Sequence, residues 1–251
     1  MTLEVSKSFR PTIAGTAALF LLSALFANLG LWQTKRAGEK SETEHQHQAA
    51  TTVAFEVALQ EKKRFARINV TGHYDQARHI LLDNQILNGR AGVHVYTPFY
   101  TTGNTVILVN RGWLPLAADR QSLPEIDTPH EETELAGMLN IVPVPGRLLG
   151  EADRMTHDQW PQLVTYLNLE DIAESLGAPL ENWVIQLSDK DKTGFEGRDW
   201  KPVFLSSSRH RAYAFQWFAL ATVSIIPVSY THLTLPTTSA LCRSRWGAVR
   251  E

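Results

Sequence analysis

The chain has 251 residues, of which 43% are hydrophobic, and its formal net charge is −2. A near-neutral chain carries no electrostatic footprint for nucleic acid, and a mean hydropathy of −0.19 excludes a transporter built of many membrane helices. The single cysteine, Cys242, excludes an intrachain disulfide, and the rest of the chain has no thiolate for a zinc or copper site.

Residues 1–11 form a short basic leader, and residues 12–31 form an uncharged, apolar stretch. Twenty residues at about 1.5 Å each cover the ~30 Å hydrocarbon core of a bilayer, so this stretch predicts a transmembrane helix. A cleaved signal peptide is the alternative, but its apolar region is typically about 7–15 residues long, and no Ala-x-Ala site closes this one. Lys7 and Arg10 favour a cytoplasmic N-terminus, which suits a bacterial inner membrane.

Residues 32–52 are mostly polar and predict a juxtamembrane stalk. Trp32 stands where an aromatic ring prefers the membrane–water interface. Gln33 and Arg36 follow at helical spacing, which predicts a polar, cationic stripe that meets lipid headgroups or a partner protein. The end of this segment is interpreted as a solvated linker.

Residues 53–208 predict an α+β domain with a mostly antiparallel sheet. Period-two alternation and short apolar runs predict strands around residues 68–70, 80–82, 92–98, 106–109, 135–139 and 183–187. The spacing of apolar residues from Leu169 to Leu176 predicts a helix, with Asn168 as its N-cap and Gly177 at its end. The charged segment 188–200 is predicted to be an exposed loop.

Residues 209–226 predict the start of a second membrane helix. Its uncharged part, 212–226, spans about 22 Å as a helix, which is too short for a bilayer. The sequence from Pro227 onward reads like a translated transposase-based sequencing adapter. We therefore interpret residues 227–251 as a non-native tail and the second helix as truncated; an ordinary cytoplasmic tail is the alternative.

Four short motifs stand in order along the chain: LGLWQTKR at 29–36, RHILLDN with GVHVYTP between 78 and 98, VNRGWLP at 109–115, and HRAYAFQWF at 210–218. Together they resemble the surfeit locus protein one family of cytochrome c oxidase assembly factors, over residues 12 to about 226. The resemblance implies a two-pass inner-membrane protein with a periplasmic domain. It also implies that the partners are the catalytic subunit of the oxidase, other assembly factors and the lipid bilayer.

The resemblance further implies that haem a is handled, with His210 as the ligand of the haem iron. A neutral imidazole is a normal axial ligand. Tyr213 and Trp217 would lie in an aromatic wall beside it, and Arg209 and Arg211 would pair with the haem propionates. The alternative is that these basic and aromatic residues are ordinary interface anchors at a helix end.

The motif around Arg111 has two interpretations. Arg111 and Trp113 would meet a partner surface, or Gly112 would allow a bend after a buried strand while Trp113 packs on the sheet. We favour the structural interpretation. His94 alternates with apolar neighbours, which predicts that it lies on a solvated sheet face.

Three functions remain open from the sequence. The favoured one is a membrane-anchored assembly factor that binds haem a or the nascent oxidase subunit and catalyses no reaction. The second is a cofactor-free scaffold or chaperone for oxidase subunits. The third, an anchored periplasmic enzyme, would need a catalytic cluster, whereas Gly-rich phosphate loops, Gly-x-Ser-x-Gly and His-Glu-x-x-His are absent.

Overall fold

The computed structural model describes residues 12–117, 119–120, 122–143, 155, 159–202 and 205–233. The predicted leader and residues 234–251 of the predicted tail lie outside these residues. The chain divides into a helical unit, residues 1–43 with 203–251, and a β unit, residues 44–202.

The helical unit is built on α1 (Ile13–Gln48), which begins inside the predicted membrane span and continues well beyond it. Most of the predicted stalk is therefore helical, and residues 41–48 of the part interpreted as a solvated linker continue α1. Among the helices in the described residues, α1 is the one that is long and apolar enough to cross a membrane, judged by length and composition.

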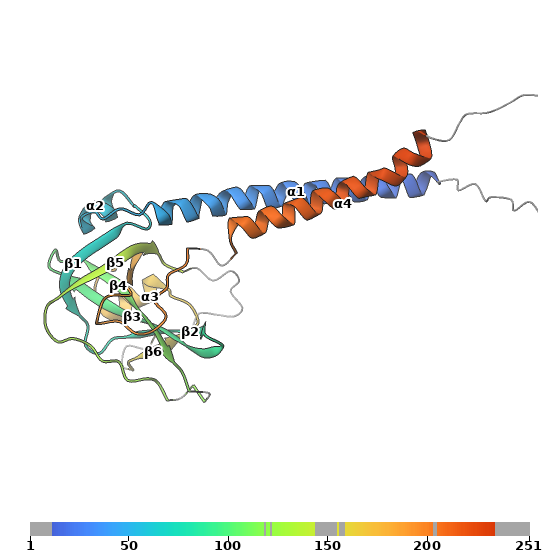
Figure 1. Ribbon diagram of the computed structural model, residues 1–251. Helices are drawn as coiled ribbons and strands as arrows, with labels where there is room; N and C mark the ends of the chain where they lie inside the picture. The colour runs from blue at the N-terminus through green and yellow to red at the C-terminus, as the bar shows by residue number, and fades with distance from the viewer. Residues whose placement is uncertain are drawn as a thin grey trace, which may run out of the picture. The chain divides into compact units, whose positions relative to one another are not determined.

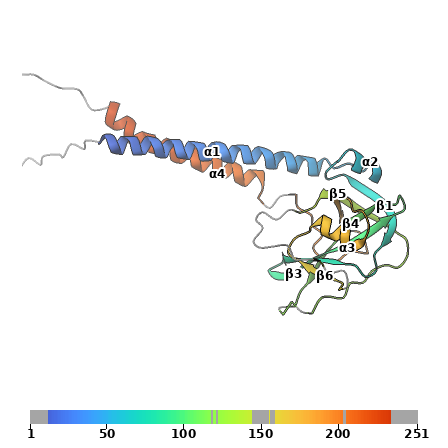
Figure 2. The ribbon, with the colours of Figure 1, turned by 180° about the vertical axis from the view of Figure 1, so that it is seen from behind.

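The second helix of this unit, α4 (Ser207–Leu233), runs beside α1 in both views (Figures 1 and 2). It is 27 residues long and its helical backbone continues through Pro227, where the sequence interpretation places the end of the native chain. The native or foreign origin of residues 227–251 stays a prediction.

The outside of this helix pair is apolar. Large hydrophobic side chains that are at least 38% exposed occur along both helices: Ile13, Phe20, Leu21, Leu22, Leu25 and Leu31 on α1, and Phe215, Phe218, Leu220, Val223, Ile225 and Ile226 on α4. Such a continuous exposed apolar surface is rare on water-soluble proteins and suits contact with lipid.

The β unit confirms the predicted α+β class. Its strands are β1 (Arg67–Tyr74), β2 (Ile80–Leu87), β3 (Arg90–Thr101), β4 (Val106–Pro115), β5 (Thr133–Ile141), β6 (Gln162–Val164) and β7 (Trp183–Leu187). They are ordered β1-β5-β7-β4-β3-β2-β6, and a further β1–β3 pairing closes five of them into a barrel. Five of the seven pairings are antiparallel; β2–β6 and β4–β7 are parallel.

Two short helices cover this sheet. Helix α2 (Phe55–Gln60) adds Phe55 and Ala58 to the main core cluster, which also contains Ile68 and Leu135 of the barrel strands. Helix α3 (Leu169–Leu176) packs against a second cluster, formed mainly by β2, β3 and β4. Strand β4 is buried over its first eight residues, as expected for a strand between β3 and β7.

The local signals for α3 are confirmed. The side chain of Asn168 accepts a hydrogen bond from the backbone N–H of Glu170 at 3.1 Å, and so acts as the N-cap. Gly177 ends the helix with a φ of 64°, a left-handed conformation that favours glycine.

Candidate functional site

The interface between α1 and α4 is lined by small residues. Ser23, Gly30 and Ala37 recur every seven residues on α1 and are buried, as are Ala214 and Ala221, also seven apart, on α4. A seven-residue repeat keeps one face of each helix against its partner, and small side chains let two membrane helices approach closely.

Two contacts fix the antiparallel register of the pair. The Ser23 hydroxyl donates to the backbone carbonyl of Ala221 at 3.1 Å. The rings of Phe26 and Trp217 stack with centroids 5.7 Å apart. Trp217 is therefore turned toward α1, where it packs between the helices.

The third contact joins His210 to Gln33. The imidazole Nδ1 lies 2.7 Å from the Gln33 side-chain oxygen, Oε1, and His210 is 7% exposed. Because an amide oxygen only accepts hydrogen bonds, Nδ1 carries the proton in this arrangement, and Nε2 of the neutral ring keeps its lone pair. Within the described residues, no hydrogen bond reaches Nε2.

His210 is the residue that would hold a haem iron, through Nε2, and this stays a prediction. A histidine that binds a metal almost always donates its other ring N–H to a protein acceptor, as His210 does to Gln33. The porphyrin fills four positions on haem iron, so one side chain is enough, whereas a bare zinc ion takes three or four protein ligands. The described residues contain no group of three or more histidine, cysteine or acidic side chains placed for a metal ion.

The other predicted haem contacts are spread around α4. Arg209 and Arg211 are exposed on either side of His210, and the Arg211 guanidinium lies 3.4 Å from the Ser207 hydroxyl. Tyr213, one turn before Trp217 on α4, is 46% exposed, whereas Trp217 stacks on Phe26. Contact of these two aromatic residues with a haem stays a prediction.

The predicted stripe at the start of the stalk is divided between two faces of α1. Gln33 is turned toward His210, whereas Trp32 and Arg36 are exposed. The Arg36 guanidinium lies 5.8 Å from the centre of the Trp32 ring and 2.8 Å from the Glu39 carboxylate. Trp32 and Arg36 therefore remain available to headgroups or a partner, and Gln33 does not.

In the β unit, Arg111 is 1% exposed and lies between the rings of Tyr74 and Phe195, each 4.8 Å away. Its guanidinium donates to the carbonyl of Thr193 at 2.6 and 2.9 Å, to the carbonyl of Asp127 at 2.6 Å, and to the hydroxyl of Thr128 at 3.0 Å. Burial lowers the pKa of Arg111 from its ordinary value. These contacts favour the structural interpretation of Arg111, because a partner cannot reach a side chain enclosed in this way.

Gly112 and Trp113 complete the same junction. Gly112 has a φ of 114°, and a Cβ there would lie 2.6 Å from the carbonyl oxygen of Glu196. The Trp113 backbone N–H donates to that same oxygen at 2.7 Å, and its indole N–H donates to the carbonyl of Gln85 at 3.0 Å. Because Trp113 is only 2% exposed, its ring is not accessible to a partner, and its predicted partner contact is not supported.

The segment attached by these contacts, residues 188–200, is named the covering loop. It was predicted to be exposed, but Arg198 and Trp200 are partly buried and donate to the carbonyls of Ser188 and Leu187 at 2.5 and 2.7 Å. Trp200 also lies edge-on to His94, with ring centroids 5.6 Å apart. His94 is therefore covered rather than solvated, and burial lowers its pKa to about 4.

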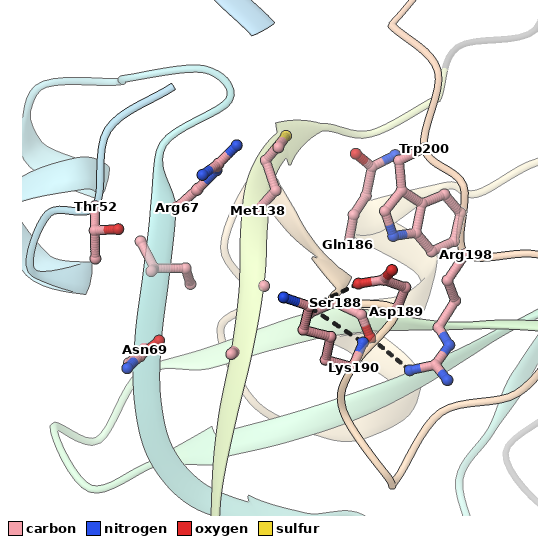
Figure 3. Close-up of a pocket in the computed structure, with 13 residues that line it drawn as sticks. Thr52, Arg67, Asn69, Met138, Gln186, Ser188, Asp189, Lys190, Arg198 and Trp200 are labelled. Atoms are coloured by element: carbon pink, nitrogen blue, oxygen red, sulfur yellow. Dashed lines mark hydrogen bonds between the residues drawn. The ribbon is translucent and has the colours of Figure 1, made fainter. Parts of the chain in front are cut away.

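The covering loop also bounds a cavity of about 400 Å³ on the outer face of β1, β5 and β7 (Figure 3). Figure 3 shows Arg67 and Asn69 of β1 and Met138 of β5 lying across from Lys190 and Trp200 of the loop. Sequence reasoning missed this cavity, because residues far apart in the chain line it.

Comparison with known proteins gives the family relationship. Residues 20–222 match the sequence profile of the SURF1 family. The chain is 26% identical to the SURF1-like protein of Rickettsia conorii, over 83% of this chain and 87% of that one. It is also 26% identical to the SURF1-like proteins of Rickettsia bellii (79% and 82% covered) and Rickettsia prowazekii (83% and 86%).

Proposed function

The chain belongs to the SURF1 family, and from that premise we propose that it is a membrane-anchored assembly factor for haem–copper oxidase that handles haem a and catalyses no reaction. The family is associated with cytochrome oxidase assembly. When bound, haem a would supply the redox and oxygen chemistry of the oxidase; this chain's own residues would bind it, orient it and release it to the catalytic subunit.

The observation that carries the haem part of this proposal is the state of His210. The residue is 7% exposed, its Nδ1 is used by Gln33, and within the described residues no hydrogen bond reaches Nε2. A neutral imidazole nitrogen with an unused lone pair is a normal ligand of haem iron.

The helix pair supports a two-pass membrane topology. Exposed apolar side chains on both α1 and α4 favour lipid around the whole unit, and Gln33 lies two residues past the predicted span 12–31. Lys7 and Arg10 favour a cytoplasmic N-terminus; the β unit would then lie in the periplasm of a bacterial cell and the His210 site at the periplasmic end of the helices.

The experiment is to purify the full chain from cells that make haem a and to record its absorption spectrum. We expect a haem band that is lost in His210→Ala and retained in the matched control His45→Ala, which removes an exposed histidine from the same helix pair. A His210→Ala variant that keeps the whole band would contradict ligation by His210.

A cofactor-free scaffold is the second candidate, because the His210–Gln33 bond also joins the two helices. A hydrogen bond between membrane helices contributes about 0.6–2 kcal/mol, so it has structural value without a ligand. This function predicts copurification with the oxidase subunit but no stoichiometric haem in the wild-type chain, which is the result that separates it from the first.

A further inference from the structure

We propose that Gln33 is a positioning residue for His210: it holds the imidazole as the Nδ1–H tautomer and sets the plane of the ring, so that Nε2 is presented to haem iron. This inference rests on the proposed function. It also assigns a role to one polar residue of the first membrane helix, a residue that the sequence placed among contacts to headgroups or a partner.

The geometry gives Gln33 this role. His210 and Gln33 are 177 residues apart in the chain and meet because α1 and α4 pack antiparallel. At 2.7 Å the bond is short for a nitrogen donor and an amide oxygen, and His210 is only 7% exposed. In a buried site of low dielectric such a bond is electrostatically stronger than it is in water, so it biases the tautomer of the ring strongly.

The surrounding contacts keep Gln33 in place. Toward the membrane, the Phe26–Trp217 stack and the Ser23–Ala221 hydrogen bond fix the helix register. The backbone N–H of His210 donates to the carbonyl of Ser206 at 3.3 Å, in the first turn of α4. The two ends of the bond therefore come from regular helix backbones in a fixed register, which is how a second residue orients a metal ligand.

The first measurement is made without haem. In the full chain in detergent, ¹⁵N NMR of the His210 ring distinguishes the Nδ1–H tautomer from the Nε2–H tautomer. We expect the wild type to show Nδ1–H, and Gln33→Leu, which removes the acceptor, to show a mixture. Gln33→Glu keeps an acceptor oxygen and is expected to retain the Nδ1–H form.

The second measurement uses the chain loaded with haem a. Loss of a residue that orients a metal ligand typically weakens metal binding about 10- to 100-fold, so we expect Gln33→Leu to lower haem affinity by about that factor. A carboxylate acceptor makes the imidazole more electron-rich, so Gln33→Glu is expected to keep the haem and to lower its reduction potential. A merely structural role for Gln33 would not move the potential.

Ser23→Ala is the matched control, because it removes another side-chain hydrogen bond between the same two helices, at 3.1 Å, without touching His210. We expect it to leave the tautomer, the spectrum and the potential unchanged. Gln33→Asn, whose shorter side chain does not reach His210 from the same backbone position, is the second variant if Gln33→Leu fails to insert.

The outcomes separate the two proposals. If His210→Ala keeps the haem band, ligation by His210 is refuted whatever Gln33 does. If His210→Ala loses the band while Gln33→Leu and Gln33→Asn keep the wild-type tautomer and affinity, the role of Gln33 is refuted and the ligand stands. If Ser23→Ala weakens haem binding as much as Gln33→Leu does, Gln33 acts through helix packing and the positioning role is also overturned.

Discussion

Replacing Arg111 by lysine tests whether this buried guanidinium holds the covering loop onto the barrel. The change keeps the positive charge and removes the planar fork. In the structure, the fork reaches two different segments at once, Thr193 in the covering loop and Asp127 with Thr128 in the segment before β5. A lysine ammonium carries its donors on a single nitrogen and cannot span these acceptors together.

The magnitude follows from the contacts that are lost. Arg111 makes four hydrogen bonds, two of them to the one carbonyl oxygen of Thr193; a lysine that kept one bond to that oxygen would lose the contacts to Asp127 and Thr128. Hydrogen bonds to a charged group contribute about 1.5–3 kcal/mol each, and partial replacement by new lysine contacts reduces the loss, so we expect about 3 kcal/mol of destabilisation. Loss of planar stacking on Tyr74 and Phe195 adds about 0.5–1 kcal/mol.

The assay is urea unfolding of the full chain in detergent, followed by tryptophan fluorescence, with hydrogen exchange measured over residues 188–200. We expect a lower midpoint and faster exchange in the covering loop. Arg120→Lys is the matched control: Arg120 is 52% exposed, and a lysine can keep its ion pair with the buried Asp83 through a single nitrogen, so we expect little change. If Arg111→Lys changes neither the midpoint nor loop exchange, the structural reading of Arg111 is wrong.

Three further predictions concern other sites. Gly112→Ala is expected to destabilise the β unit by more than about 1 kcal/mol, because φ is 114° and the new methyl meets a backbone carbonyl; thermal unfolding measures it. Gly30→Ala places a Cβ 2.7 Å from the ring of Phe218, whereas nothing lies within 4 Å at Gly38; crosslinking of α1 to α4 should fall in Gly30→Ala and stay unchanged in Gly38→Ala. Burial lowers the pKa of His79 and His94 to about 4. Between pH 6.5 and 4 the unfolded chain therefore binds more protons at these histidines than the folded chain does. The free energy of unfolding should fall by up to about 3 kcal/mol per histidine as the pH drops through that range. Urea midpoints at pH 7 and pH 5 test this, and a midpoint that does not fall at pH 5 contradicts it.

Features with a local cause were predictable. Asn168 and Gly177 mark the ends of α3 because capping involves residues next to the helix. The turn before β4 has a local cause of the same kind, because Asn tolerates a positive φ and Asn104 has a φ of 61°. The strand class followed from alternation, since each strand has one face in the core.

Residues 41–48 were interpreted as a solvated linker because they are polar, whereas α1 continues through them. Residues 35–48 include Lys, Arg, Glu and Gln, which are good helix formers, and they follow a helix that is already nucleated. Extending an existing helix avoids the unfavourable first turn, so a polar segment after a membrane span continues as helix unless a residue stops it. The Arg36–Glu39 pair, three residues apart, adds to this.

Contacts between segments that are far apart in the chain could not be predicted from the sequence. His94 looked solvated because strand alternation describes one strand and carries no information about a loop that covers it about a hundred residues later. The Gln33–His210 bond is of the same kind: each residue stood in a recognised motif, but nothing local indicated that the two motifs meet. The cavity beneath the covering loop could not be predicted either, because most of its lining residues come from three strands and a loop that only the folded barrel brings together.

The motifs that carry the family resemblance separate into two groups by the partners of their polar atoms. Every guanidinium nitrogen of Arg111 and the indole N–H of Trp113 donate inside the β unit, so folding alone explains why these residue types are needed there. At His210, folding explains Nδ1 and leaves Nε2 without a partner among the described residues. A ring nitrogen that no described residue uses is the place to look for a ligand, and this difference is why the haem proposal rests on the helix pair and not on the barrel.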